Sequence, residues 1–384
     1  MLQKIAAQMD LRKFAALALA LGLAACGTTT TTEETSEGTE SAAAGDETVS
    51  EASGEKIFDS NVALTGAGAS FPAPIYQNWF VELNKKVPEL QVNYQSVGSG
   101  AGVEQFTAET VNFGASDVAM QDDEIAAIDD GAILLPMTAG AIVMAYNLPG
   151  VEQLNLTRDA YVNILLGNIT SWDDPAIADA NPDVELPAQP ITVVHRSDGS
   201  GTTGVFTKHL SAISDEWASA IGEGKSVEWP TTGTFVGGKG NEGVTAQIQQ
   251  TEGAIGYVEF GYAENNGLTV AALENASGNF VTPSGESASA TLDAVELPEN
   301  LRAFITDPEG DQSYPVVTYT WMLVYENYED PQVAKAVEVM VEYGLNEGQE
   351  AAPQLGYIAL PPSVRERVAE AADGLSPDYD ITVQ

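Results

Sequence analysis

Apolar and polar residues alternate along the chain in the manner of short buried strands followed by amphipathic helices. Residues 90–97 alternate like a strand, and residues 76–83 place aromatic and aliphatic side chains at helical spacing. A nearly continuous apolar stretch over 133–146, interrupted by Pro136 and Gly140, indicates buried strands. Further strands are predicted at 62–64, 111–117, 191–194, 253–260 and 316–325, and further helices at 204–210 and 331–343. The pattern predicts an α/β protein.

The first 25 residues have the pattern of an export signal. A basic start precedes the apolar run of residues 14–25, which is too short to cross a bilayer, since a core of about 30 Å needs about 20 residues. The run ends in LAACG (residues 23–27), which resembles the lipobox of bacterial lipoproteins. The alternative is a signal peptide followed by an incidental cysteine. We expect a lipoprotein signal peptide over 1–25 and lipidation of Cys26.

Residues 26–55 are expected to form a flexible acidic tether that starts at the lipidated cysteine. Between residues 27 and 55 the only large apolar side chain is Val49, so this stretch cannot bury enough surface to offset the entropy of ordering. The globular part therefore begins at about residue 56.

The composition excludes several classes of protein. The 56 Asp and Glu residues against 15 Lys and Arg give a net charge of -41, which argues against a nucleic-acid binder because such proteins need clustered cations. Cys26 is the only cysteine, so an internal disulfide and a multi-cysteine metal site are excluded. The two histidines leave little material for a transition-metal site. We expect neither a metal nor a cofactor.

Three Gly/Ser/Thr turns carry the candidate chemistry, and each follows a predicted strand and precedes a predicted helix. They contain Ser70-Phe71, Ser99-Gly100 and Ser200-Gly201-Thr202. Helix N-termini offer free N–H groups and a partial positive charge, and hydroxyl groups add further donors. Three such turns together could enclose an anion. Taken singly, each is also explained as an ordinary N-cap or turn.

Arg196 stands beside the third of these turns, two residues before Asp198. A guanidinium matches an oxyanion with a planar fork of donors, and a nearby carboxylate can hold it in place. The alternative is a surface ion pair, which is worth about 0 to 1 kcal/mol. The neighbouring turn favours a role in ligand binding.

Asp117 follows the predicted strand at 111–117, where a carboxylate would repel an anion. An ionised carboxylate can, however, accept a hydrogen bond from an oxyanion that carries a proton, and it would reject a fully deprotonated one. That chemistry would discriminate phosphate from sulfate. Equally, Asp117 could simply cap the segment after its strand.

Catalytic motifs do not fit this sequence. Ser99 and Ser200 lack the flanking glycines of a nucleophile elbow, and no Walker A loop is present. His195 could serve Ser200 as a base in a phosphate-ester hydrolase, but a solvated or strand-capping histidine is the simpler interpretation. The five tryptophans are expected in the core or between domains. No catalytic residue is predicted.

Several motifs, in order along the chain, resemble the phosphate-binding protein of bacterial phosphate ABC transporters. They are TGAGASFPAP (65–74), NYQ (93–95) with Gly98-Ser99, FGASD (113–117), RSDGSGT (196–202), GGKGN (237–241) and GAIGYVE (253–259), with Tyr314-Pro315 near the last helices. Long ordered motifs are far more specific than any single glycine-rich turn, and these extend over nearly the whole globular part.

The resemblance implies a type II periplasmic binding protein, in which two α/β lobes joined by two crossovers close over one phosphate. Lobe one would comprise residues 56–138 plus 315–384, and lobe two residues 139–314. In that family the ligand is bound by residues that correspond here to Ser70, Phe71, Ser99, Asp117, Arg196, Ser200, Gly201 and Thr202, and Asp198 matches the residue that orients the arginine.

The function so implied is an exported receptor that binds inorganic phosphate and delivers it to an ABC permease in the membrane. The receptor would be anchored through Cys26, would bind no nucleic acid, and is expected to be a monomer. A receptor for sulfate or molybdate and the phosphate-ester hydrolase are the alternatives. Gly100 and Ala101 depart from the family pattern and put one auxiliary backbone contact in doubt, and the stretch 231–236 looks long.

The acidity of the chain generates a prediction about salt. A net charge of -41 opposes the compact state through self-repulsion, and salt of about 1 M shortens the Debye length to roughly 3 Å. We expect a protein adapted to high external salt, with a melting temperature that rises from low to molar salt. Thermal unfolding followed by circular dichroism checks this, and a flat or falling melting temperature contradicts it.

Overall fold

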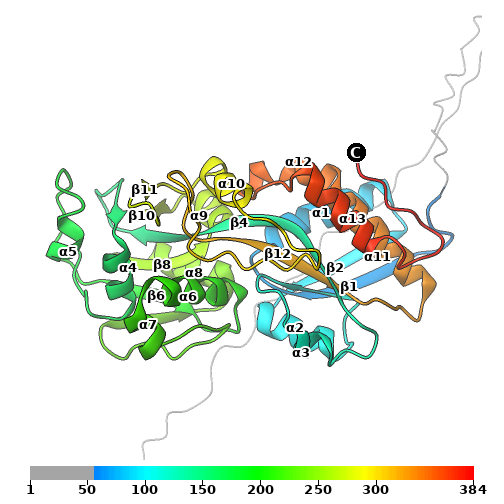
Figure 1. The fold of residues 1–384 in the computed structure, drawn as a ribbon, viewed down its shortest axis with the longest axis horizontal. Helices are drawn as coiled ribbons and strands as arrows, with labels where there is room; N and C mark the ends of the chain where they lie inside the picture. The colour runs from blue at the N-terminus through cyan, green and yellow to red at the C-terminus, as the bar shows by residue number, and fades with distance from the viewer. Residues whose placement is uncertain (1–55) are drawn as a thin grey trace, which may run out of the picture. The chain divides into compact units, whose positions relative to one another are not determined.

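A nine-stranded mixed sheet runs through residues 56–384, which are the part of the chain that the computed structural model describes (Figure 1). Its strand order is β2-β1-β3-β12-β4-β8-β6-β7, with β9 paired to β4. The strands are β1 (Val62–Gly68), β2 (Leu90–Ser96), β3 (Phe113–Ser116), β4 (Ile133–Asn147), β6 (Thr192–Arg196), β7 (Thr234–Gly238), β8 (Ala254–Glu259), β9 (Thr269–Val270) and β12 (Val317–Val324). A smaller sheet pairs β11 (Phe280–Val281), β10 (Ala272–Glu274) and β5 (Asn155–Leu156).

Helices connect and cover these strands, as the α/β prediction requires. They are α1 (Ala73–Lys86), α2 (Ser99–Thr107), α3 (Asp122–Ile125), α4 (Arg158–Leu165), α5 (Pro175–Ala178), α6 (Gly201–Ile213), α7 (Asp215–Ala220), α8 (Gly240–Gln250), α9 (Phe260–Asn265), α10 (Gly285–Asp293), α11 (Pro331–Leu345), α12 (Glu347–Ala351) and α13 (Pro362–Ala372), with a 3-10 helix at Pro353–Leu355. Because β2 and β3 lie on opposite sides of β1, right-handed crossovers place α1 and α2 on opposite faces of the sheet (Figure 1).

The two halves of the large sheet share one strand. We call β2, β1, β3 and β12 the first half, and β8, β6 and β7 the second half. Strand β4 pairs with β12 along residues 133–141 and with β8 along residues 142–147. All eight residues of β12 are buried, as are the inner thirteen residues of β4. The chain therefore passes between the halves through buried, hydrogen-bonded strands.

Strand β4 is one continuous strand of 15 residues, where the sequence indicated several. Its register with β12 shifts between Thr320 and Trp321, so that Thr320 pairs with Thr138 and Trp321 with Pro136. Proline cannot donate to a ladder, but here it lies where the ladder is already irregular. The bulge is what allows the strand to continue past Pro136.

One predicted strand and one predicted helix were too short because glycines were interpreted as turn residues. Strand β1 continues to Gly68, since the Gly66-Ala67-Gly68 segment pairs with both β2 and β3. Helix α6 begins at Gly201 and not at residue 204, with Ser200 as its N-cap. The second correction places Gly201 and Thr202 in the first turn of α6, whereas Ser70 and Phe71 still lie between β1 and α1.

The tryptophans pack as predicted. Trp79, Trp172, Trp217 and Trp321 are buried. Trp229 is half-buried, and its ring stacks on that of His195 at a centroid distance of 4.9 Å. Four of the five tryptophan side chains thus belong to the protein interior, and the fifth packs partly against it.

The predicted signal peptide, Cys26 and the tether lie outside the described residues. Among residues 56–384, no helix combines the length and the apolarity needed to cross a membrane.

The close packing of β1 against β3 generates a prediction. A Cβ atom on Gly66 would lie 2.1 Å from the ring of Phe113, which is itself buried. We expect Gly66→Ala to lower the free energy of unfolding by about 1–3 kcal/mol in a urea titration. Gly285→Ala is the control, because nothing lies within 4 Å of that position. Equal effects of the two substitutions would contradict the packing argument.

Candidate functional site

The three predicted turns meet between the two halves of the sheet. Ser70 follows β1 in the first half, and its Oγ accepts a hydrogen bond of 3.0 Å from the backbone N–H of Asn241, which follows β7 in the second half. The N–H of Gly100 donates to the carbonyl of Gly199 across the same boundary, at 2.8 Å. Ligands of open α/β sheets bind in such crevices beyond the carboxyl ends of strands. The structure thus brings together residues that are far apart in the sequence.

The turn after β1 is held by three tyrosine hydroxyl groups that donate to three successive carbonyl groups. Tyr94 donates to the carbonyl of Ala69 at 2.7 Å and Tyr262 to that of Ser70 at 2.7 Å. Tyr357 donates to the carbonyl of Phe71 at 2.6 Å. Because a peptide unit is planar, fixing the Ser70 carbonyl also fixes the direction of the next N–H, that of Phe71. The predicted backbone donor is therefore held rigidly.

Ser99 opens helix α2 and faces the second half. Its Oγ accepts a hydrogen bond of 3.3 Å from the backbone N–H of Asp117. Gly98 precedes it with φ of 94°, and a Cβ atom there would lie 2.3 Å from an oxygen of Asp198. A glycine is required at this N-cap because the second half approaches so closely.

Asp117 is buried at the end of β3 and is held by β12. The hydroxyl of Thr320 donates to its Oδ1 at 2.9 Å, and that of Thr318 donates to its backbone carbonyl at 3.2 Å. Its Oδ2 lies 3.5 Å from the hydroxyl of Thr202, in the second half. Burial raises the pKa of Asp117 to about 7, although the hydrogen bond from Thr320 and the charge of Arg196 oppose that rise. One carboxylate oxygen thus has a short hydrogen bond, while the other has only a long one.

Arg196 and Asp198 form a buried bidentate pair, so the interpretation as a surface ion pair is wrong. Nε donates to Oδ1 at 2.8 Å and Nη2 to Oδ2 at 2.6 Å, and Arg196 is 5% exposed. The backbone N–H of Gly240 also donates to Oδ1 of Asp198, at 3.0 Å. Burial alone would raise the pKa of Asp198, but the guanidinium outweighs it and lowers that pKa. Nη1 of Arg196 is left outside the pair, 3.4 Å from the hydroxyl of Thr202.

The first turn of helix α6 carries the third motif. The Oγ of Ser200 caps the helix by accepting from the N–H of Thr203 at 3.0 Å. Gly201 and Thr202 are buried in this turn. A Cβ atom on Gly201 would lie 2.5 Å from the Oγ of Ser99. The glycine lets the helix N-terminus reach the first half of the sheet.

Sequence reasoning missed two buried residues of the site. Asn241, fully buried in the first turn of α8, contacts Ser70 and Thr202 with its side chain. Thr320, also fully buried, holds Asp117. Asn241 ends the GGKGN motif but follows strand β7, which the sequence pattern did not predict. Thr320 lies within a strand whose sequence pattern is that of an ordinary buried strand, so no local sequence signal indicates a role in the site.

His195 is placed as a structural residue. Its Nδ1 lies 2.8 Å from the carbonyl oxygen of Arg196, and burial lowers its pKa. Within residues 56–384 no hydrogen bond joins it to Ser200, whose Oγ accepts from the N–H of Thr203. His195 is therefore not placed to serve Ser200 as a base.

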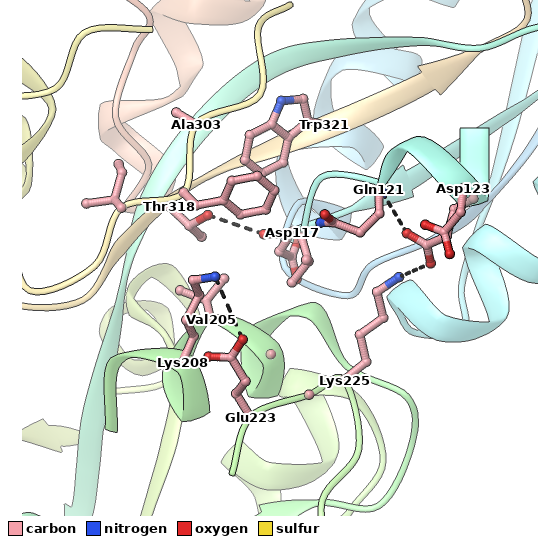
Figure 2. Close-up of a pocket in the computed structure, with 16 residues that line it drawn as sticks. Asp117, Gln121, Asp123, Val205, Lys208, Glu223, Lys225, Ala303, Thr318 and Trp321 are labelled. Carbon is pink, nitrogen blue, oxygen red and sulfur yellow. Dashed lines mark hydrogen bonds and ion pairs between the residues drawn. The ribbon is translucent and has the colours of Figure 1, made fainter. Parts of the chain in front are cut away.

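A cavity of about 490 Å³ lies beside Asp117. Figure 2 shows Trp321 and Thr318 on one side of it and Val205, Lys208 and Glu223 on another. At its rim Lys225 of the second half pairs with Glu124 of helix α3 at 3.2 Å. Asp117 is the only predicted binding residue that lines this cavity. The other predicted binding residues lie outside its lining.

Comparisons with known proteins agree with this arrangement. A family model described as a PBP superfamily domain matches residues 29–343. The phosphate-binding protein PstS of Pasteurella multocida is 43% identical over 309 residues, which cover 79% of this chain and 88% of that protein. The phosphate-binding protein PstS of Methanocaldococcus jannaschii is 39% identical over 330 residues, which cover 79% of this chain and 84% of that protein.

Solved structures share the fold. The phosphate-binding protein from Stenotrophomonas maltophilia superposes with a TM-score of 0.67 at 21% identity, covering 82% of this chain and 95% of that one. An ABC-type phosphate transport receptor from Vibrio cholerae gives a TM-score of 0.51 at 19% identity, covering 78% of this chain and 100% of that one.

The raised pKa of Asp117 generates a prediction for the protein stripped of ligand. Folding raises this pKa from 3.8 to about 7, so the folded state holds the proton more tightly and ionisation costs stability as the pH rises from about 4 to 7. We expect Asp117→Asn to match the native protein near pH 4 and to be more stable at pH 8, by about 4 kcal/mol. Urea unfolding at pH 4, 6 and 8 measures this. A stability difference that does not change with pH would contradict it.

Proposed function

Because the chain belongs to the phosphate-binding proteins of the PBP superfamily, we propose that it is the extracytoplasmic receptor that binds inorganic phosphate for import by an ABC transporter. Its fold is that of a type II periplasmic binding protein, with two α/β lobes joined by two crossovers. It is a binding protein and not an enzyme.

One observation carries this proposal: hydrogen-bond donors from both halves of the sheet converge on a single buried place that contains one carboxylate. The donors are the hydroxyl groups of Ser70, Ser99, Ser200 and Thr202, the guanidinium of Arg196, and the N–H groups of Phe71 and Gly201. A tetrahedral oxyanion needs many donors around it, and a helix N-terminus and an oriented guanidinium supply them. These residues are proposed as the binding site, with Asp198 orienting Arg196.

Asp117 sets which oxyanion is bound. The Oδ1 atom accepts from Thr320, so Oδ2 is the oxygen available to a ligand. In its ionised form that oxygen accepts a hydrogen bond from an oxyanion that carries a proton, and it repels one that carries none. Phosphate carries a proton near neutral pH and sulfate does not. The site therefore favours phosphate over sulfate or molybdate.

Binding would close the two lobes over the ligand. We assign residues 56–138 plus 315–384 to lobe one and 139–314 to lobe two. The contacts from Asn241 to Ser70 and from Gly100 to Gly199 support a closed form in which both lobes contribute to one site. Because the closed form alone completes the set of donors, affinity depends on the closure equilibrium.

The cellular setting follows from the export signal and from the relatives. We propose that Cys26 is lipidated after removal of residues 1–25, so that the receptor stays at the outer face of the membrane on the tether 26–55. There it would act as a monomer and deliver phosphate to the ABC permease.

Calorimetric titration with phosphate and then sulfate tests the proposal. The protein stripped of ligand is expected to bind one phosphate and little sulfate. Asp117→Asn removes the fixed negative charge and adds a donor, so we expect weaker phosphate binding and a gain of sulfate binding of about tenfold or more. Absence of phosphate binding at any salt concentration would overturn the proposed function, and turnover of a phosphate ester would favour the hydrolase.

A further inference from the structure

Asn241 lies between the two sheet halves, and both polar atoms of its side chain are hydrogen bonded. It is fully buried in the first turn of helix α8. Its Oδ1 accepts a hydrogen bond of 3.0 Å from the backbone N–H of Glu259. Because that N–H can only donate, the orientation of the amide is forced, and Nδ2 must face the other way. Nδ2 donates to the Oγ of Ser70 at 3.0 Å and to the Oγ1 of Thr202 at 3.2 Å.

Each of the two hydroxyl groups that receive these bonds also lies beside a second group that can only donate. The Oγ of Ser70 accepts from both the backbone N–H and the Nδ2 of Asn241. The Oγ1 of Thr202 accepts from Nδ2 of Asn241 and lies 3.4 Å from Nη1 of Arg196. A hydroxyl group has two lone pairs and one proton. With both lone pairs engaged, each hydroxyl has only its proton left to offer, and that of Thr202 lies toward Oδ2 of Asp117, at 3.5 Å.

We propose that Asn241 is a positioning residue that turns the hydroxyl protons of Ser70 and Thr202 toward the bound anion. The inference rests on the proposed function, because the anion is the phosphate of that site. Asn241 acts through the two hydroxyl groups and is not itself a ligand-binding residue. Without the amide, the Thr202 hydroxyl keeps only its long contacts to Nη1 of Arg196 and Oδ2 of Asp117, so it is less firmly held and can present a lone pair, which would repel an anionic oxygen.

The placement of Asn241 also links donor orientation to closure. The residue follows β7 in the second half, whereas Ser70 follows β1 in the first half. The hydrogen bonds to Ser70 form only when the halves meet. The hydroxyl of Ser70 is therefore committed to donation in the closed form and is free in an open one, which makes the closed form the better anion receptor.

A double-mutant cycle tests the proposal by calorimetric titration of the ligand-stripped protein with phosphate. Asn241→Leu is expected to weaken phosphate binding about 10- to 100-fold. In a Thr202→Val background one of the two hydroxyl groups that depend on the amide is gone, so the same substitution should weaken binding at least fivefold less. A purely structural role would give the same fold-change in both backgrounds, and that result would overturn the proposal.

A matched control is available in the same helix. Thr245 is buried in α8, and its hydroxyl has no partner within residues 56–384. Thr245→Val is expected to leave phosphate affinity unchanged. If Asn241→Leu does not fold, Asn241→Asp keeps an acceptor for the N–H of Glu259 and carries the same cycle. Its added charge acts in both backgrounds, so the difference between them still measures the coupling.

Failure of the inference and failure of the proposed function give different results. If the native protein binds sulfate and not phosphate, the proposed function is overturned. The double-mutant cycle is then measured with sulfate. A loss of sulfate affinity that differs between the native and Thr202→Val backgrounds still supports the role of Asn241. If the native protein binds neither anion, both are overturned. If it binds phosphate and the fold-changes are equal in the two backgrounds, only the role of Asn241 is overturned.

Discussion

The site depends on the buried pair between Arg196 and Asp198. A guanidinium that is 5% exposed would be costly without a partner, and the carboxylate compensates its charge through two parallel hydrogen bonds. The same carboxylate accepts from the N–H of Gly240 and so fixes the start of helix α8. Position 98 must be glycine because the Asp198 carboxylate lies too close to it for a Cβ atom. One ion pair thus places a cationic donor, a helix N-terminus and the facing loop of the first half.

The local environment of the site opposes the charge of the whole molecule. At a net charge of -41 the long-range field repels anions, and salt screens that field over distances beyond about a Debye length. At contact distance, fixed dipoles and one oriented guanidinium dominate because they are buried and little screened. An acidic surface and an anion site can therefore coexist, since they act over different distances.

Sequence patterns predicted the α/β architecture, the three turns, Arg196 and Asp117, because hydrophobic periodicity and Gly/Ser/Thr composition are local signals. Element ends were less accurate at Gly68 and Gly201, where glycine serves close packing and not a turn. Asn241 and Thr320 were missed for a different reason. Asn241 contacts Ser70 from 171 residues away, and Thr320 contacts Asp117 from 203 residues away, so only the folded arrangement reveals these roles. The motif resemblance covered the loop of Asn241 without assigning a role to it.

The sharing of β4 by both halves has a mechanical consequence. Since β4 is hydrogen bonded to β12 along residues 133–141 and to β8 along residues 142–147, sliding one half along the strand would break a ladder. Twisting or bending the strand near its midpoint preserves most of those bonds. The stiffness of that motion is then a property of the paired backbone and not of the side chains around the anion. Substitutions among the side chains around the anion would therefore change how tightly the ligand is held while leaving the paired backbone of β4 intact.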